Sequence, residues 1–166
     1  MAQITFKGDP VNTAGSLPSV GDKAPDFSVV DTGLGTVKLS DFAGKKVVLN
    51  VFPSVDTGVC AMQLKAFSQK LAGKEDVVLL FVSQDLPFAF KRFCGAEAIE
   101  NAVTTSDFRG GSFAAGYGVK MTDGPLEGLL ARATLVLDES HTVTHSELVS
   151  EITEEPNYDA AIAALA

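Results

Sequence analysis

The chain has 166 residues, 46% of them hydrophobic, which is enough to build the core of a single domain and excludes intrinsic disorder. Its formal charge is −8, from 13 basic and 21 acidic residues, and no Lys/Arg run exceeds the pair Lys45-Lys46, which argues against a nucleic-acid partner. No apolar run approaches the roughly 20 residues of a membrane span, and the N-terminus lacks a signal-peptide pattern. We therefore expect one cytoplasmic domain over residues 1–166 with no membrane partner.

The first half of the chain predicts a hairpin, a strand, a helix and a second strand. Residues 1–20 are expected to form a short β-hairpin. Val47–Phe52 is rich in β-branched residues and predicts a buried strand that ends at Pro53. From Gly58 the apolar spacing becomes helical, with one face formed by Cys60, Leu64, Phe67 and Leu71. Val77–Val82 predicts a second core strand, and the strand–helix–strand order predicts that the two strands are parallel.

The second half predicts two more helices and the rest of the sheet. A helix is expected after Asp85 as N-cap, with Pro87 in its first turn and an end at Gly95. Three further strands are expected, at Ala102–Thr105, Ala133–Asp138 and Thr142–Val149. A turn at Asp138–His141 would make the last two antiparallel, and a helix at Tyr158–Leu165 closes the chain. Together these elements predict an α/β protein with a thioredoxin-like fold, in which helices flank a central mixed sheet.

The segment Pro53–Cys60 places a cysteine in the first turn of a helix, directly after a core strand. Unpaired N–H groups and the helix dipole at that position favour the thiolate over the thiol. Thr57 can direct its hydroxyl at the sulfur and at an incoming peroxide, and Pro53 would stiffen a loop that shields the sulfur. Alternatively Cys60 is an inert buried side chain, Thr57 only an N-cap and Pro53 only a turn residue. The combined P-x-x-x-T-x-x-C spacing at a strand-to-helix junction favours the catalytic interpretation.

Two other residues also have two interpretations each. Cys94 ends an apolar helical stripe, where it could equally be a packing residue. Arg132 enters an apolar strand, and a buried guanidinium needs an anionic or carbonyl partner, which a thiolate would provide. A structural salt bridge is the other interpretation of Arg132. Arg92 and Arg109 are further candidates for an arginine beside the sulfur.

The chain resembles the peroxiredoxins, because Pro53, Thr57 and Cys60 match their P-x-x-x-T-x-x-C signature. Other segments resemble the bacterial thiol peroxidase branch, namely Asp85-Leu-Pro-Phe-Ala, Arg92-Phe-Cys-Gly-Ala-Glu97, Asp123-Gly-Pro-Leu126, Gly128-Leu-Leu-Ala-Arg-Ala133 and Glu151-Ile-Thr-Glu-Glu-Pro156. The resemblance covers nearly the whole chain. It implies a thioredoxin-like fold and a homodimeric enzyme that reduces hydrogen peroxide and favours alkyl hydroperoxides, without a cofactor or metal.

The same resemblance implies a role for each matched residue. Cys60 would be the peroxidatic cysteine, Cys94 the resolving cysteine of an intramolecular Cys60–Cys94 disulfide, and thioredoxin the reductant. Arg132 would stabilise the thiolate and the polarised O–O bond. Because a disulfide needs Cα atoms within about 7 Å, we predict that helix ends must unwind if the reduced fold holds the two sulfurs further apart.

Other functions would leave different patterns. A thiol–disulfide oxidoreductase usually carries C-x-x-C, but Thr57 and Gln63, three positions either side of Cys60, offer no second thiol. A redox sensor that passes its disulfide to a partner would use the same cysteines, and a purely structural binding module requires the pattern to be chance. No recognised metal-ligand spacing occurs among His141, His145 and Glu147. An apolar rim suited to bulkier peroxides is expected from three aromatic residues, Phe52, Phe88 and Phe93.

Overall fold

The computed structural model describes residues 1–97, 99 and 101–166. Its strands are β1 (Gln3–Phe6), β2 (Asp9–Asn12), β3 (Ser28–Asp31), β4 (Thr36–Lys38), β5 (Lys46–Val51), β6 (Val77–Ser83), β7 (Ala102–Ser106), β8 (Ala133–Leu137) and β9 (Val143–Leu148). Its helices are the 3-10 helix η1 (Leu39–Phe42) and the α-helices α1 (Gly58–Lys70), α2 (Pro87–Ala96), α3 (Ser112–Tyr117) and α4 (Tyr158–Ala163).

The central sheet is mixed, with the strand order β4-β3-β7-β6-β5-β8-β9 over the described residues. Strands β5, β6 and β7 run parallel to one another, whereas β8 is antiparallel to β5 and β9 is antiparallel to β8. The predicted parallel pair, final hairpin and thioredoxin-like architecture are therefore confirmed. The most hydrophobic strands, β5 and β6, lie in the middle because both their faces are buried.

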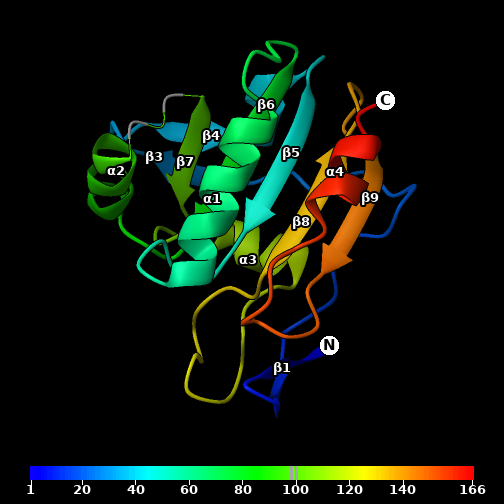
Figure 1. Cartoon of the computed structure of the whole chain (residues 1–166). Coiled ribbons are helices and arrows are strands. Elements are labelled where there is room, and N and C mark those ends of the chain that lie inside the picture. The colour runs from blue at the N-terminus through cyan, green and yellow to red at the C-terminus, as the bar shows by residue number, and fades with distance from the viewer. Residues whose placement is uncertain (98, 100) are drawn as a thin grey trace.

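Helices cover both faces of this sheet (Figure 1). One apolar cluster joins α1, α2 and α4 to one face, and Phe67, Phe81 and Phe90 are among its fully buried members. A second cluster joins α3 to the opposite face through Phe113 and Tyr117. The active-site helix α1 is thus fixed over the centre of the sheet, with its first turn directly after the loop that leaves β5.

The structure corrects the predicted start of α2. Its N-cap is Leu86, with Pro87 in the first turn, and the helix ends at Ala96, one residue beyond the predicted Gly95. Asp85 does not cap the helix because its carboxylate is turned toward the loop after β5, where it accepts hydrogen bonds from Ser54 and Val55. Four further elements were not predicted from the sequence, namely η1, α3 and the short strands β3 and β4.

The N-terminal hairpin is confirmed as a separate two-stranded sheet of β1 and β2. Figure 1 shows it projecting beyond one end of the central sheet, beside the loop that connects α3 to β8. A third apolar cluster holds it there, through buried residues that include Ile4, Met121 and Ile152. None of the helices in the described part of the chain has the length and apolar character of a membrane span.

Candidate active site

Cys60 lies at the third position of α1, as the sequence predicted, and its side chain has no exposed surface. The first turn of an α-helix has N–H groups without intrahelical partners, and the helix dipole places positive charge there. Both effects act on a sulfur that is shielded from water. Thr57 is the N-cap of α1, although its side chain makes no capping hydrogen bond.

Arg132 directly precedes β8 and points its side chain at this cysteine. Its Nη1 donates to Sγ of Cys60 at 3.2 Å and to Oε1 of Gln63 at 2.9 Å, and its Nε donates to the carbonyl of Ile152 at 3.0 Å. The guanidinium is only 2% exposed, and none of these described partners is a carboxylate. The salt-bridge interpretation of Arg132 is therefore wrong. A buried guanidinium without a carboxylate partner is costly, and here its positive charge lies directly against the sulfur of Cys60.

Gln63, which accepts a hydrogen bond from Arg132, is in turn hydrogen-bonded to Asn50. Neither residue was predicted from the sequence to belong to the site. Nε2 of Gln63 donates to Oδ1 of Asn50 at 3.3 Å, and both side chains are fully buried. Nδ2 of Asn50 has no hydrogen-bond partner among the described residues. A signal was available, since Gln63 lies one turn after Cys60 on the apolar face of the helix and Asn50 interrupts an apolar strand.

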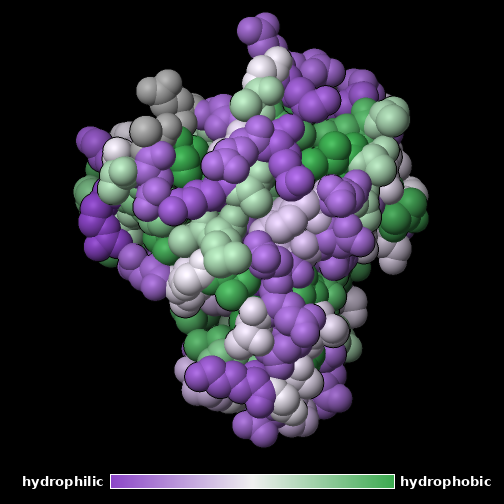
Figure 2. All heavy atoms as spheres, viewed as in Figure 1, coloured by the Kyte–Doolittle hydropathy of each residue, from purple (hydrophilic) through white to green (hydrophobic). Residues whose placement is uncertain are grey.

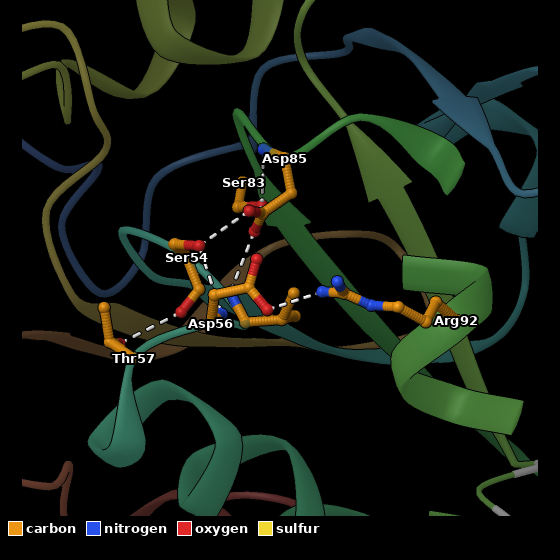
Figure 3. Close-up of polar contacts among 7 residues, drawn as sticks. Ser54, Asp56, Thr57, Ser83, Asp85 and Arg92 are labelled. Carbon is orange, nitrogen blue, oxygen red and sulfur yellow. Dashed lines mark hydrogen bonds and ion pairs between the residues drawn. The ribbon is translucent and has the colours of Figure 1, made fainter. Parts of the chain in front are cut away.

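The loop between β5 and α1 is held by a network of polar contacts (Figure 3). The carboxylate of Asp85 accepts hydrogen bonds from Oγ of Ser54 at 2.7 Å, from the backbone N–H of Val55 at 2.9 Å and from Oγ of Ser83 at 2.6 Å. The hydroxyl of Thr57 donates to the carbonyl of Ser54 at 3.0 Å rather than to Cys60. Pro53, buried as the loop begins, adds its own constraint on the backbone.

Figure 3 also shows Arg92 reaching from α2 to Asp56 of the same loop. The two form an ion pair of 2.6 Å in which both side chains are more than 60% exposed. Arg109 stacks over the ring of Phe108. Of the three candidate arginines, Arg132 is therefore the one that the structure places against the sulfur of Cys60.

Cys94 lies in the last turns of α2, half-buried, and both cysteines are free thiols. Burial raises the pKa of the Cys94 thiol, against a smaller opposing effect of a hydrogen bond with Thr104 of β7. Thr104 and Phe81 are neighbours across β7 and β6, and the row continues through Asn50 to Thr134 of β8. Three strand spacings of about 4.8 Å separate Thr104 from Thr134, or about 14 Å. Thr104, the partner of Cys94, thus belongs to β7, whereas Arg132, the partner of Cys60, directly precedes β8, and β6 and β5 lie between these two strands.

A pocket of about 170 Å³ lies beside the arginine, with a predominantly apolar lining. Its wall is made by residues of four segments, namely Phe6, Pro53, Thr57, Gly58, Val59, Leu126, Leu129, Arg132, Ile152 and Thr153. Figure 2 shows hydrophobic surface at the junction between the body of the molecule and its hairpin end. None of Phe52, Phe88 and Phe93, the three residues expected at the rim, is among the residues that line this pocket, and Phe52 is wholly buried in the core.

Other parts of the described chain lack comparable chemistry. A larger hollow of about 390 Å³ lies between α1 and the segment that joins α2 to β7, and its described lining includes neither a cysteine nor an arginine. Within residues 1–97, 99 and 101–166, no three His, Cys, Asp or Glu side chains gather as metal ligands. A ring nitrogen of His141 instead lies 3.0 Å from the carbonyl of Phe42.

Comparison with known proteins gives one consistent result. The model of the Redoxin family matches residues 19–162. The chain is 52% identical to the thiol peroxidase of Leptospira interrogans serovar copenhageni over 166 residues, covering 99% of this chain and 97% of that protein. It is also 52% identical to the thiol peroxidase of Mycobacterium bovis over 165 residues, covering 99% of each chain. The crystal structure of a peroxiredoxin-like protein from Aquifex aeolicus superposes with a TM-score of 0.93 at 40% identity, covering 98% of this chain and 95% of that one.

Proposed function

Because this chain belongs to the redoxin family and is an enzyme, a peroxidase of the peroxiredoxin type, we propose that Cys60 is its peroxidatic residue and Cys94 its resolving residue. The observation that carries the first assignment is the contact of 3.2 Å between Nη1 of Arg132 and the fully buried sulfur of Cys60. A thiolate is the nucleophile in such chemistry, and here the only charge beside it among the described contacts is a cation.

The first step transfers one oxygen atom. The Cys60 thiolate attacks the terminal oxygen of the hydroperoxide, so that an S–O bond forms while the O–O bond breaks. The sulfur is oxidised to a sulfenic acid, and the leaving alkoxide or hydroxide takes a proton to become an alcohol or water. Arg132 stabilises the negative charge that moves onto the leaving oxygen. Thr57 lines the same pocket, and its hydroxyl would donate to the bound peroxide after exchanging its present bond to Ser54.

The second step closes a disulfide and needs a change of shape. Cys94 attacks the sulfenic acid of Cys60, forming the S–S bond and releasing water. The partner of Cys94 lies on β7 and that of Cys60 directly before β8, with two strands between them, whereas a disulfide brings the Cα atoms within about 7 Å. We therefore propose that the first turn of α1, the end of α2 or both unwind. A dithiol protein of the thioredoxin type then reduces the disulfide by thiol–disulfide exchange.

The substrates proposed are hydrogen peroxide and alkyl hydroperoxides, with a preference for the latter. The apolar pocket beside Arg132 supports this preference, since its volume of about 170 Å³ equals that of roughly five or six water molecules. Hydrogen peroxide would leave most of it unfilled, whereas a small organic group would bury apolar surface there.

We also propose that two copies of the chain form a homodimer. Three large apolar side chains are exposed near the carboxyl ends of β6 and β7: Leu86 is 50% exposed, Phe88 64% and Phe108 42%. Exposed apolar residues that cluster in this way mark interaction surfaces. Light scattering tests the proposal: the wild type should have the mass of a dimer, and Phe88→Ser should weaken the association. A wild type that is monomeric at micromolar concentration would disprove it.

The test of the whole cycle is peroxide consumption with thioredoxin, thioredoxin reductase and NADPH. Wild type, Cys60→Ser and Cys94→Ser would each be offered hydrogen peroxide and cumene hydroperoxide at neutral pH. We expect Cys60→Ser to be inactive, and Cys94→Ser to reduce one equivalent of peroxide without thioredoxin-coupled turnover. Full activity of Cys60→Ser would disprove the catalytic assignment. A wild type that is oxidised once but does not turn over would indicate a redox sensor.

A further inference from the structure

The N-terminal hairpin is joined to the segment that follows β9 by backbone hydrogen bonds. The N–H of Thr5 donates to the carbonyl of Ser150 at 2.7 Å, and the N–H of Ile152 donates to the carbonyl of Thr5 at 2.9 Å. These bonds form a parallel bridge between Thr5 and Glu151. This bridge joins two segments that are far apart in the sequence, and both lie beside the pocket.

The carboxylate of Glu151 binds both sides of this junction. On the hairpin it accepts hydrogen bonds from Oγ1 of Thr5 at 3.0 Å and from the N–H groups of Lys7 and Gly8 at 3.2 and 2.9 Å. On its own loop it accepts from the N–H and the hydroxyl of Thr153, at 2.9 and 2.8 Å. These bonds, led by those from Thr153 and Gly8, lower the pKa of the Glu151 carboxyl to about 2. The carboxyl group of Glu151 is therefore an anion at neutral pH, and both of its oxygens accept hydrogen bonds.

The residues next to these contacts form one wall of the pocket. Phe6 lies between Thr5 and Lys7, and its side chain lines the pocket together with Ile152 and Thr153. Lys7 and Gly8 both have positive φ, 52° and 87°, so the turn holds its N–H groups in a fixed direction toward the carboxylate. The position of Phe6 thus depends on the bonds that Glu151 makes to the residues on either side of it.

We propose that Glu151 is a positioning residue for substrate specificity, which holds the N-terminal hairpin against the site so that Phe6 packs on the organic group of an alkyl hydroperoxide. Hydrogen peroxide has no such group and does not use this wall. The proposal rests on the peroxidase cycle proposed above. It assigns to the hairpin a part in choosing the substrate and leaves the attack by Cys60 to the groups around Arg132.

The test compares kcat/KM for cumene hydroperoxide and for hydrogen peroxide in matched variants of the full chain. Glu151→Gln keeps the size of the side chain but turns an NH2 group toward backbone donors, and Phe6→Ala removes the wall directly. The control is Glu154→Gln, which makes the same change of charge at an exposed position of the same loop. Circular dichroism and thermal melting establish that each variant is folded. Should Glu151→Gln fail to fold, Thr5→Val removes a single hydrogen bond to the carboxylate and serves in its place.

We expect kcat/KM for cumene hydroperoxide to fall roughly tenfold in Glu151→Gln and in Phe6→Ala, with the value for hydrogen peroxide changed by less than about twofold. The double variant should be no worse than the poorer single one, because both changes act on one wall. The proposal would be overturned if kcat/KM fell equally for both peroxides, or if the ratio of the two kcat/KM values did not change. Fully additive losses of kcat/KM in the double variant would also overturn it. A wild type inactive with both peroxides would instead disprove the peroxidase cycle.

Discussion

We expect Asp85 to control how readily the loop between β5 and α1 opens, and its substitution by Asn tests the proposed unwinding. Opening the loop breaks the hydrogen bonds that Ser54 and Val55 donate to the Asp85 carboxylate. Asn keeps one acceptor oxygen and places an NH2 group where the other oxygen stood. The oxygen can face the N–H of Val55, and the hydroxyl of Ser54 can rotate to accept from the NH2 group, so both charge-assisted bonds are replaced by neutral ones.

The magnitude follows from the usual strengths of such bonds. A hydrogen bond to a charged group contributes about 1.5–3 kcal/mol, and a neutral one about 1 kcal/mol. Replacing two bonds to the carboxylate by two neutral bonds therefore destabilises the closed loop by roughly 2 kcal/mol, which raises the equilibrium constant for opening roughly 30-fold. Where opening limits disulfide formation, Cys94 should reach the sulfenic acid faster by up to that factor, and less Cys60 should be overoxidised at a given peroxide concentration.

The assay mixes reduced protein with excess cumene hydroperoxide, quenches with acid at successive times and measures disulfide and sulfinic acid by mass spectrometry. The matched control is Asp138→Asn, because the Asp138 carboxylate likewise holds a turn, by accepting from the N–H groups of Ser140 and Thr142, but lies between β8 and β9, at the opposite end of β8 from Arg132. We expect faster disulfide formation and less sulfinic acid in Asp85→Asn alone. Unchanged or slower disulfide formation in Asp85→Asn would refute the view that this carboxylate holds the loop closed.

Three more predictions concern the site itself. Arg132→Met should slow the reaction of Cys60 with peroxide by about 10²–10³-fold in single-turnover measurements, since it removes the buried cation; a loss below about tenfold would contradict its role. Gln63→Glu places a competing carboxylate beside the guanidinium and should slow the same step about tenfold, and unchanged kinetics would mean that the Arg132–Gln63 contact is irrelevant to the charge. Because burial raises the pKa of Cys94, the folded state holds that proton more tightly than the unfolded state, so this contribution to stability is complete at neutral pH and is lost as the pH rises above about 8.5. In urea melts Cys94→Ser should therefore lose less stability than the wild type between about pH 8 and about pH 10, and equal losses would count against the burial of this thiol.

The sequence predicts most of the core because its periodicity is strong there. The β5–α1–β6 unit combines β-branched runs with a helical apolar stripe, so element type, direction and the place of Cys60 all follow. Strands β3 and β4 have only four and three residues, which is too short for a period to show. The Asp85 error has a different cause, since its local preference for an N-cap is overridden by tertiary hydrogen bonds to Ser54 and Val55.

Some residues of the candidate site could likewise be predicted from local sequence patterns, and others could not. Local spacing identifies Pro53, Thr57 and Cys60, whereas Arg132 lies 72 positions from Cys60 and its role came from the resemblance. Gln63 and Asn50 could have been suspected as polar residues in apolar patterns. The wall formed by Phe6 could not, because nothing local indicates that a residue near the start of the chain lies beside one 146 positions later.

That pairing of the two ends of the chain also determines when the pocket is completed during synthesis. The bridge between Thr5 and Glu151 can form only after synthesis has passed residue 151. At about 5–20 residues per second, the hairpin waits on the order of ten seconds for the segment that holds it. The β5–α1–β6 unit, whose contacts are local, can assemble well before then. The helix and sheet that carry Cys60 can therefore form before Arg132 reaches its sulfur, and the wall at Phe6, Ile152 and Thr153 is completed later still.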